Sequence, residues 1–371
     1  MKLFYSPTQI DKYSNFSDFS KEFNLGEKDL ILTRESVYNP FIKPLNLNCG
    51  VILQNKYGSG EPTDQMIDEI IKEVNEIDCE RIIAIGGGTV IDIAKLLIFE
   101  NVNNTLDLFE RKVPFNKNKK LIIIPTTCGT GSEVTNISIA EIKSKQTKMG
   151  LADNALFPDN AVIIPELVKD IPYKYFIFSA IDALIHAVES YVSPKSNSLT
   201  ESIGLHAIEL ILKGFIEINK NGQNYYSEII EDFCLGSNYA GIVFGNTGVG
   251  AVHALSYPLG GNYHVPHGES NYQFFIEVFK RYNKLNPNGK IKELNSFISN
   301  IIGCNINNVY ESLENILNNL LSKKPLKEFG MKEEEILIFT ESVLEKQQRL
   351  LANNYTPFSK EEIFDIYKNL F

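Results

Sequence analysis

The sequence has few cysteines, few histidines and no excess of basic residues. Its five cysteines lie far apart and form no Cys-x-x-Cys pair, so we expect reduced thiols in a cytosol. With 36 basic and 46 acidic residues the formal net charge is −10, which argues against nonspecific binding to nucleic acid or anionic lipid. The chain does not start with a basic segment followed by an apolar run, and no segment approaches the roughly 18 unbroken apolar residues of a membrane span. We therefore expect a cytoplasmic protein with a small-molecule partner.

The length of 371 residues exceeds the size at which one hydrophobic core usually stops growing, so two domains are expected. Short runs in the first half are apolar at consecutive positions, as strands covered on both faces require. These runs are DLILT (29–33), GVILQ (50–54), RIIAI (81–85), LIIIP (121–125) and AVIIP (161–165). A helical pattern at 62–77 lies between two of them, and this alternation predicts a parallel, doubly wound sheet. The segment 135–153 breaks the alternation and predicts a strand pair.

After about residue 165 the strand pattern fades, and helical patterns such as 178–192 and 206–218 take over. The sequence thus predicts an α/β domain at 1–166 and an all-helical domain at 167–371.

Three glycines, Gly86 to Gly88, stand between a predicted strand and a predicted apolar helix. Glycine lets the backbone approach a ligand, and the N–H groups and dipole of the following helix attract an anion such as a pyrophosphate. The segment does not complete G-x-G-x-x-G, because Ile91 stands where the third glycine should be. A tight turn that binds nothing is the alternative.

A second turn of this kind follows the strand predicted at 121–125. It carries hydroxyl groups that can donate hydrogen bonds, on Thr126, Thr127, Thr130 and Ser132. Two such turns at adjacent strand ends would line one crevice at the carboxyl edge of the sheet. Together they favour a nucleotide or dinucleotide over empty loops.

A polar pair interrupts an otherwise apolar helix in the second half. Asp182 and His186 are four residues apart, so their side chains share a helix face. A solvated surface pair is the alternative, but the apolar flanks mean that the pair must find a partner. His253 and His267 could supply it, and one carboxylate with three imidazoles suits Fe(II) or Zn(II).

The two other histidines are weaker candidates for the site. We expect His264 to lie in a turn from which alternating side chains diverge, near Pro266 and the glycines. We expect His206 to open an amphipathic helix and to be structural.

Four motifs resemble, in order, those of the iron-containing (group III) alcohol dehydrogenases. They are GGGTVIDIAK, PTTCGTGSEVT, DALIHAVESYVS and VHALSYPLGGNYHVPHG. The resemblance implies a Rossmann-like α/β domain that binds NAD, a helical catalytic domain and a dehydroquinate synthase-like architecture. It implies that Asp182, His186, His253 and His267 bind a catalytic metal. Its cofactor-contacting segments match Gly87, Gly88, Thr89, Asp92, Thr126, Thr127, Thr130 and Ser132, and Lys148 is a further match.

Two residues depart from the family pattern. Tyr257 stands where many relatives have a second histidine that is assigned to proton transfer, so a phenol, or a hydroxyl or water relay, would replace it. Tyr257 could also bind a substrate oxygen or simply fill a helix interface. Arg34 stands where relatives often have an aspartate that binds the adenosine ribose, and it could admit the phosphate of NADP. Equally, Arg34 could face solvent, and Glu35 or a backbone group could bind the ribose. We expect NAD as the preferred cofactor.

Further stretches, including KYGSGEPTDQMID and SNYAGIVFGN, are similar to the branch of this family that interconverts 4-hydroxybutyrate and succinate semialdehyde. That similarity implies a carboxylate-bearing alcohol or aldehyde as substrate and a homodimer or larger homo-oligomer. Candidates for the carboxylate anchor are Tyr257, Tyr263, His264 and Asn238, each of which could equally be packing. The alternatives are another short-chain alcohol or diol dehydrogenase, a dehydroquinate synthase-like lyase, and a nucleotide-binding protein without catalysis.

Overall fold

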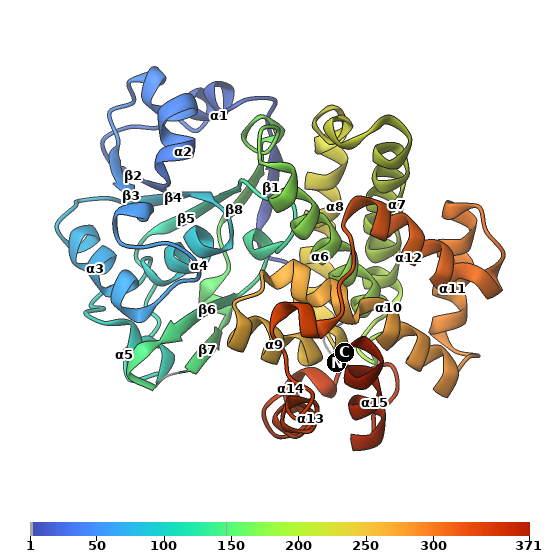
Figure 1. Ribbon diagram of the computed structural model, residues 1–371. Coiled ribbons are helices and arrows are strands. Elements are labelled where there is room, and N and C mark those ends of the chain that lie inside the picture. Colours follow the sequence, from blue (N-terminus) through green and yellow to red (C-terminus); the bar gives the residue numbers. More distant parts are fainter. Residues whose placement is uncertain (1–2, 146) are drawn as a thin grey trace. The chain divides into compact units, whose positions relative to one another are not determined.

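The computed structural model describes residues 3–145 and 147–371, which form two compact units. An α/β unit spans Ser6–Ile171, and a helical unit spans Pro172–Phe371 and includes residues 3–5 (Figure 1). The predicted fold class, a parallel α/β sheet followed by a helical half, is confirmed. The division of labour predicted for residues 1–166 and 167–371 stays a prediction.

The α/β unit is built on a parallel sheet in the order β1-β8-β5-β4-β2-β3. Its strands are β1 (Gln9–Lys12), β2 (Asp29–Thr33), β3 (Gly50–Leu53), β4 (Arg81–Gly86), β5 (Lys120–Pro125) and β8 (Asn160–Ile163). Five of the six match the apolar runs of the sequence. The predicted strand pair is the antiparallel ribbon of β6 (Ile137–Ile142) and β7 (Thr147–Ala152).

Both faces of this sheet are covered, as the consecutive apolar positions require. One face packs against α3 (Asp64–Asn75) and α4 (Gly88–Leu96), and the other packs against α1 (Phe16–Glu22). Along β4, Ile82 faces the first cluster and Ile83 the second, so successive side chains enter opposite layers. The other short α-helices described in this unit are α2 (Glu35–Val37) and α5 (Thr105–Phe109). Because the strands are parallel, the turns that carry the glycines and hydroxyls lie at one edge.

The helical unit consists of helices packed around α6 (Tyr173–Val192), α8 (Ile230–Thr247) and α10 (His267–Leu285). The others are α7 (Ser198–Asn221), α9 (Ala251–Tyr263), α11 (Lys290–Ile302), α12 (Val309–Leu320), α13 (Glu335–Lys346), α14 (Gln348–Leu351) and α15 (Lys360–Leu370). By length and composition α6 could cross a membrane, but 89% of the relevant window is buried inside the protein. That burial is typical of a core helix.

The predicted turn near Pro266 is present but short: α9 continues through the glycines to Tyr263, His264 follows in the left-handed conformation (φ 54°), and α10 begins at His267. One local prediction was wrong. His206 does not open a helix, because α7 already begins at Ser198, where Asn197 caps it.

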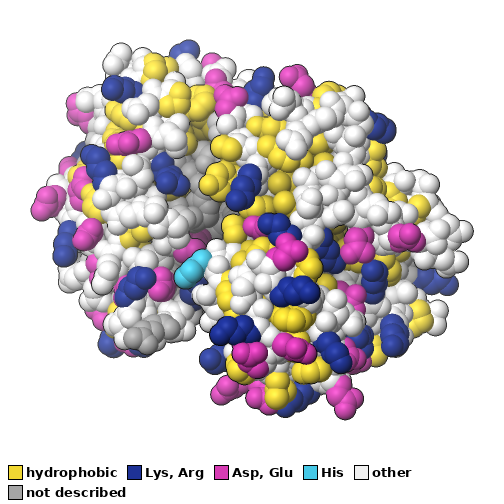
Figure 2. Space-filling model, in the orientation of Figure 1, with side chains coloured by type: hydrophobic (Ala, Val, Ile, Leu, Met, Phe, Trp, Pro, Cys, Tyr) yellow, Lys and Arg dark blue, Asp and Glu magenta, His cyan; other side chains and the backbone are white. Residues whose placement is uncertain are grey.

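The surface carries charges of both signs. Acidic and basic side chains are interspersed on the face drawn in Figure 2.

Candidate metal centre and cofactor turns

Three helices of the helical unit bring four potential metal ligands together. Asp182 and His186 lie on α6, His253 on α9, and His267 begins α10. One ligand atom from each residue lies within 4.8 Å of each of the others. The Nε2 atoms of His253 and His267 are each 3.7 Å from Asp182 Oδ1, and His186 Nε2 is 3.9 Å from Asp182 Oδ2. The four ligands predicted from the sequence are therefore neighbours in space.

These distances suit a single divalent ion. A tetrahedral ion with bonds of about 2.1 Å separates its ligand atoms by about 3.4 Å, so the side chains need only small movements to bind one. His253 Nε2 is buried and has no hydrogen-bond partner among the described residues, as expected for an atom that binds a metal ion. One carboxylate with three imidazoles is a donor set that suits Fe(II) or Zn(II).

Three of the four clustered side chains are buried, and one is exposed. The side chains of Asp182, His186 and His253 are only 3%, 6% and 4% exposed, whereas that of His267 is 46% exposed. Burial alone would raise the pKa of the Asp182 carboxyl, but the three histidines and a hydrogen bond from Asn271 outweigh it and hold this pKa below its usual value. Asp182 therefore stays an anion that can bind a metal.

Two residues that were not predicted from the sequence contact the ligands. Glu189, three residues after His186 on α6, lies 2.6 Å from Nδ1 of His253. Asn271 on α10 donates to Asp182 Oδ1 at 2.7 Å. The signal for Glu189 was present, because it is a further charged residue within the apolar run of α6. Nothing in the sequence singled out Asn271.

The glycine turn of the α/β unit joins β4 to α4 at the carboxyl edge of the sheet. Gly87 caps α4, which begins at Gly88, so the first N–H groups of this helix are available to a ligand. A Cβ on Gly86 would lie 2.6 Å from Cβ of Val90, so only glycine lets α4 pack this closely on its strand. Packing thus explains Gly86, and a phosphate site at Gly87 and Gly88 stays a prediction.

The second predicted turn lies beside the first. Pro125, at the end of β5, pairs with Gly86, and the Thr126 amide donates to the Gly86 carbonyl at 3.0 Å. A Cβ on Gly87 would be 3.3 Å from Thr127 Cγ2, and one on Gly88 would be 3.5 Å from Thr130 Cγ2. The two turns therefore form one continuous surface.

Beneath this surface lies a buried polar network. Ser132 donates to Asp92 at 3.0 Å, and the Asp92 carboxylate also accepts from the Ile139 amide at 3.1 Å. Lys95, fully buried, donates to Ser132 (2.9 Å), Thr135 (3.1 Å) and the Ile137 carbonyl (2.7 Å). Lys95 was not among the residues predicted from the sequence, although the network joins it to Asp92 and Ser132, two predicted cofactor residues.

The other cofactor candidates lie nearby in the α/β unit. Arg34 caps α2 directly after β2, the strand next to β4, so it follows the neighbouring strand end. Thr89 donates to the Gly60 carbonyl at 2.8 Å. Lys148 on β7 forms an ion pair with Glu61 at 2.5 Å.

The candidates for substrate contacts are spread over the helical unit. Tyr257 is half-buried on α9, one turn after His253, and His264 is exposed at the end of this helix. Tyr263 donates its hydroxyl hydrogen bond to Glu335, and Asn238 is fully buried on α8. His206 is exposed, stacks on Tyr239 and lies apart from the ligand cluster in sequence and contacts.

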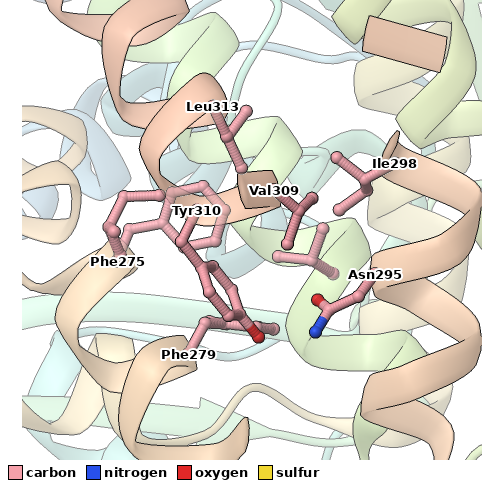
Figure 3. A pocket seen from close by; sticks show the side chains of 9 residues that line it. Phe275, Phe279, Asn295, Ile298, Val309, Tyr310 and Leu313 are labelled. Carbon is pink, nitrogen blue, oxygen red and sulfur yellow. The ribbon is translucent and has the colours of Figure 1, made fainter. Parts of the chain in front are cut away.

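A small hollow among α6, α10, α11 and α12 is not a substrate pocket. Figure 3 shows its largely aromatic and aliphatic lining, with the Asn295 amide beside Tyr310. Its volume of about 10 Å³ holds at most a single water molecule. None of the four clustered ligands lines it.

Comparisons with known proteins find matches over both units of the chain. Residues 10–165 match the iron-containing alcohol dehydrogenase family model, and residues 176–371 match the model of the C-terminal part of Fe-containing alcohol dehydrogenases. The 4-hydroxybutyrate dehydrogenase of Clostridium kluyveri is 55% identical over 371 residues, 100% of both chains. The long-chain-alcohol dehydrogenase 1 of Geobacillus thermodenitrificans is 34% identical over 78% of this chain and 74% of its own.

Solved structures share the fold at lower identity. Sulfoacetaldehyde reductase from Bifidobacterium kashiwanohense, in complex with NAD+, has a TM-score of 0.86 at 22% identity and covers 99% of this chain and 98% of its own. A 1,3-propanediol oxidoreductase has a TM-score of 0.84 at 22% identity over the full length of both chains. The chain belongs to the iron-containing alcohol dehydrogenase family.

Proposed function

We propose that this enzyme interconverts 4-hydroxybutyrate and succinate semialdehyde. In the reducing direction, succinate semialdehyde, NADH and a proton give 4-hydroxybutyrate and NAD+. The observation that carries the proposal is the complete one-carboxylate, three-imidazole cluster in a chain of this family. The choice of substrate is supported by 55% identity over full length to the C. kluyveri protein.

We assign the metal to Asp182, His186, His253 and His267, with Fe(II) or Zn(II) as the ion. When bound, the ion would polarise the oxygen of the reacting carbon, and the nicotinamide would supply or accept the hydride. Asp182 contributes the negative charge of the set, and the burial of Asp182, His186 and His253 would limit the access of bulk water to the ion. The exposed side of His267 leaves the direction from which a substrate oxygen can approach.

We assign the cofactor to the two turns of the α/β unit, with NAD as the preferred dinucleotide. Gly87 and Gly88 would receive the pyrophosphate at the start of α4, and the residues Thr89, Thr126, Thr127 and Thr130 would surround it. Asp92 and Ser132 would not need to contact the cofactor, because their hydrogen bond would hold the second turn in place. Lys148 and Arg34 remain proposed contacts, and Arg34 is the residue through which NADP would be admitted.

We assign Tyr257 either to proton transfer or to a hydrogen bond with the substrate oxygen. It is one helical turn from His253, on the same face of α9, so its phenol shares a helix face with a metal ligand. Tyr263 is the weakest candidate for the carboxylate anchor, because its hydroxyl is engaged with Glu335.

Net oxidation of NADH tests the proposed reaction. Protein loaded with Fe(II) or Zn(II) under anaerobic conditions is mixed with NADH and succinate semialdehyde, and the absorbance of the nicotinamide is followed. A stoichiometric loss of NADH supports the proposal, whereas a dehydroquinate synthase-like lyase would return the cofactor unchanged. The homo-oligomer expected from the family resemblance stays a prediction, which light scattering can test.

A further inference from the structure

We propose that Glu189 is a positioning residue for the metal: it fixes His253 in the tautomer whose proton is on Nδ1. This tautomer leaves the lone pair of Nε2 free toward Asp182. The inference deepens the proposed metal site and rests on it. It concerns a residue outside the four ligands.

The geometry leaves the Glu189 carboxylate little freedom. The side chain is 2% exposed, and its Oε2 lies 2.6 Å from His253 Nδ1. Its other oxygen, Oε1, accepts a hydrogen bond from the Val252 amide at 2.7 Å. Both oxygens are therefore acceptors for groups in the first turn of α9, and one carboxylate orients both the backbone and the imidazole of that turn.

The ring of His253 is held between this carboxylate and the ligand cluster. Its Nε2 is 3.7 Å from Asp182 Oδ1, and its plane stacks on His186 with ring centroids 4.8 Å apart. A neutral imidazole has one N–H and one lone pair, so a proton held on Nδ1 by Glu189 places the lone pair on Nε2. A carboxylate behind a metal-binding histidine performs this task in many metal sites.

The charge of Glu189 has a second consequence. In the described part of the chain no lysine or arginine forms an ion pair with it, although a buried carboxylate is costly without a compensating charge. Asp182 and Glu189 together carry two negative charges, which equal the charge of one divalent ion. With a divalent ion bound by neutral imidazoles, the charges of Asp182 and Glu189 would balance the charge of the ion, and neither carboxylate would do so alone.

The variant Glu189→Gln separates this role from simple packing. Glutamine has nearly the same shape, but it offers one acceptor oxygen and one NH2 donor. If its oxygen accepts from Val252, its NH2 faces His253 Nδ1, which must then become an acceptor. The ring proton moves to Nε2, toward the ligand cluster, and blocks metal binding there. If Glu189 had only a structural role, the substitution would lower the stability of the protein but leave the ring proton of His253 on Nδ1.

Two measurements on the full-length protein test the inference. Nitrogen-15 NMR of the histidine rings is recorded without metal, at an alkaline pH at which the ring shifts themselves show that His253 is neutral, and it reports which nitrogen carries each proton. The affinity for Zn(II) is measured by competition with a chromophoric chelator. We expect the His253 proton on Nδ1 in the wild type and on Nε2 in Glu189→Gln, with a Kd for Zn(II) raised about 10- to 100-fold.

Glu314→Gln is the matched control, because Glu314 on α12 accepts hydrogen bonds from Lys280 and Lys323 and contacts no ligand. It should leave the tautomer and the affinity unchanged. The inference is overturned if wild-type His253 carries its proton on Nε2, a result that does not depend on the folding of any variant. It is also overturned if Glu189→Gln binds Zn(II) like the wild type while His267→Ala does not, and in that case the metal site itself stands. A wild-type protein that binds no Zn(II) or Fe(II) overturns the metal site and the inference together.

Discussion

Gly268 lies directly against the carbonyl oxygen of Phe178. A Cβ at position 268 would stand 2.0 Å from that oxygen and 3.3 Å from Cβ of Asp182. The absence of a side chain thus lets the first turn of α10 touch α6, and this contact places His267, the preceding residue, 3.7 Å from the Asp182 carboxylate.

Replacing Gly268 with alanine should therefore weaken metal binding. The methyl group cannot fit against a backbone oxygen, so α10 must shift and carry His267 away from Asp182. We expect a loss of roughly 1–3 kcal/mol in the free energy of unfolding and a Kd for Zn(II) at least about tenfold higher. Gly261→Ala on α9 is the control, because its Cβ would meet nothing within 4 Å. Equal affinities in the two variants would show that the approach of α10 is not needed for the site.

Because Lys95 is buried, we expect the protein to become more stable as the pH rises above about 8. Burial lowers the pKa of its amine to about 8, although the charges of Asp92 and Glu133 oppose the shift. Between about pH 8 and the ordinary lysine pKa the native state binds fewer protons than the unfolded state, so the free energy of unfolding rises with pH. The full window corresponds to roughly 3 kcal/mol. Denaturant titrations give the free energy of unfolding of the wild type and of Lys95→Met at each pH. As the pH rises, the value for the wild type should increase relative to that for Lys95→Met. A difference that does not change with pH would contradict this pKa.

Arg34→Asp should change the preference between cofactors. A carboxylate after β2 accepts a ribose hydroxyl and repels a 2′-phosphate, so we expect the ratio of kcat/KM for NADPH to that for NADH to fall at least about tenfold. Steady-state rates with both cofactors measure the ratio. If the ratio does not change and Glu35→Gln weakens NADH binding instead, Arg34 faces solvent and Glu35 binds the ribose.

Tyr257→Phe tests the assignment of the phenol. Removing a group that moves a proton should lower kcat by about 100-fold or more and leave the Kd for Zn(II) unchanged. Tyr263→Phe, on the same helix, removes a hydroxyl that is bound to Glu335 and should retain most of the activity. A Tyr257→Phe enzyme with wild-type kcat would assign Tyr257 to packing.

The sequence predicted the parts of the fold that rest on local pattern. Consecutive apolar residues located the covered strands, but β1, with the sequence QIDK, escaped notice because it is a short edge strand without an apolar run. Helical spacing correctly placed Asp182 beside His186. The approach of His253 and His267 depends on how α9 and α10 pack on α6, which spacing alone does not determine. The hydrogen bond of Glu189 to His253 likewise joins positions 64 residues apart.

The most direct test of the proposed function compares two aldehydes with metal-loaded protein. Initial rates of NADH oxidation are measured with succinate semialdehyde and with butyraldehyde, which has the same chain length but no carboxylate. We expect kcat/KM to be at least about 100-fold higher for the semialdehyde, because a site that binds the carboxylate leaves its own polar groups unpaired with butyraldehyde. Equal values would retain the dehydrogenase but contradict 4-hydroxybutyrate as its substrate, and no oxidation of NADH or NADPH with either aldehyde would contradict hydride transfer itself.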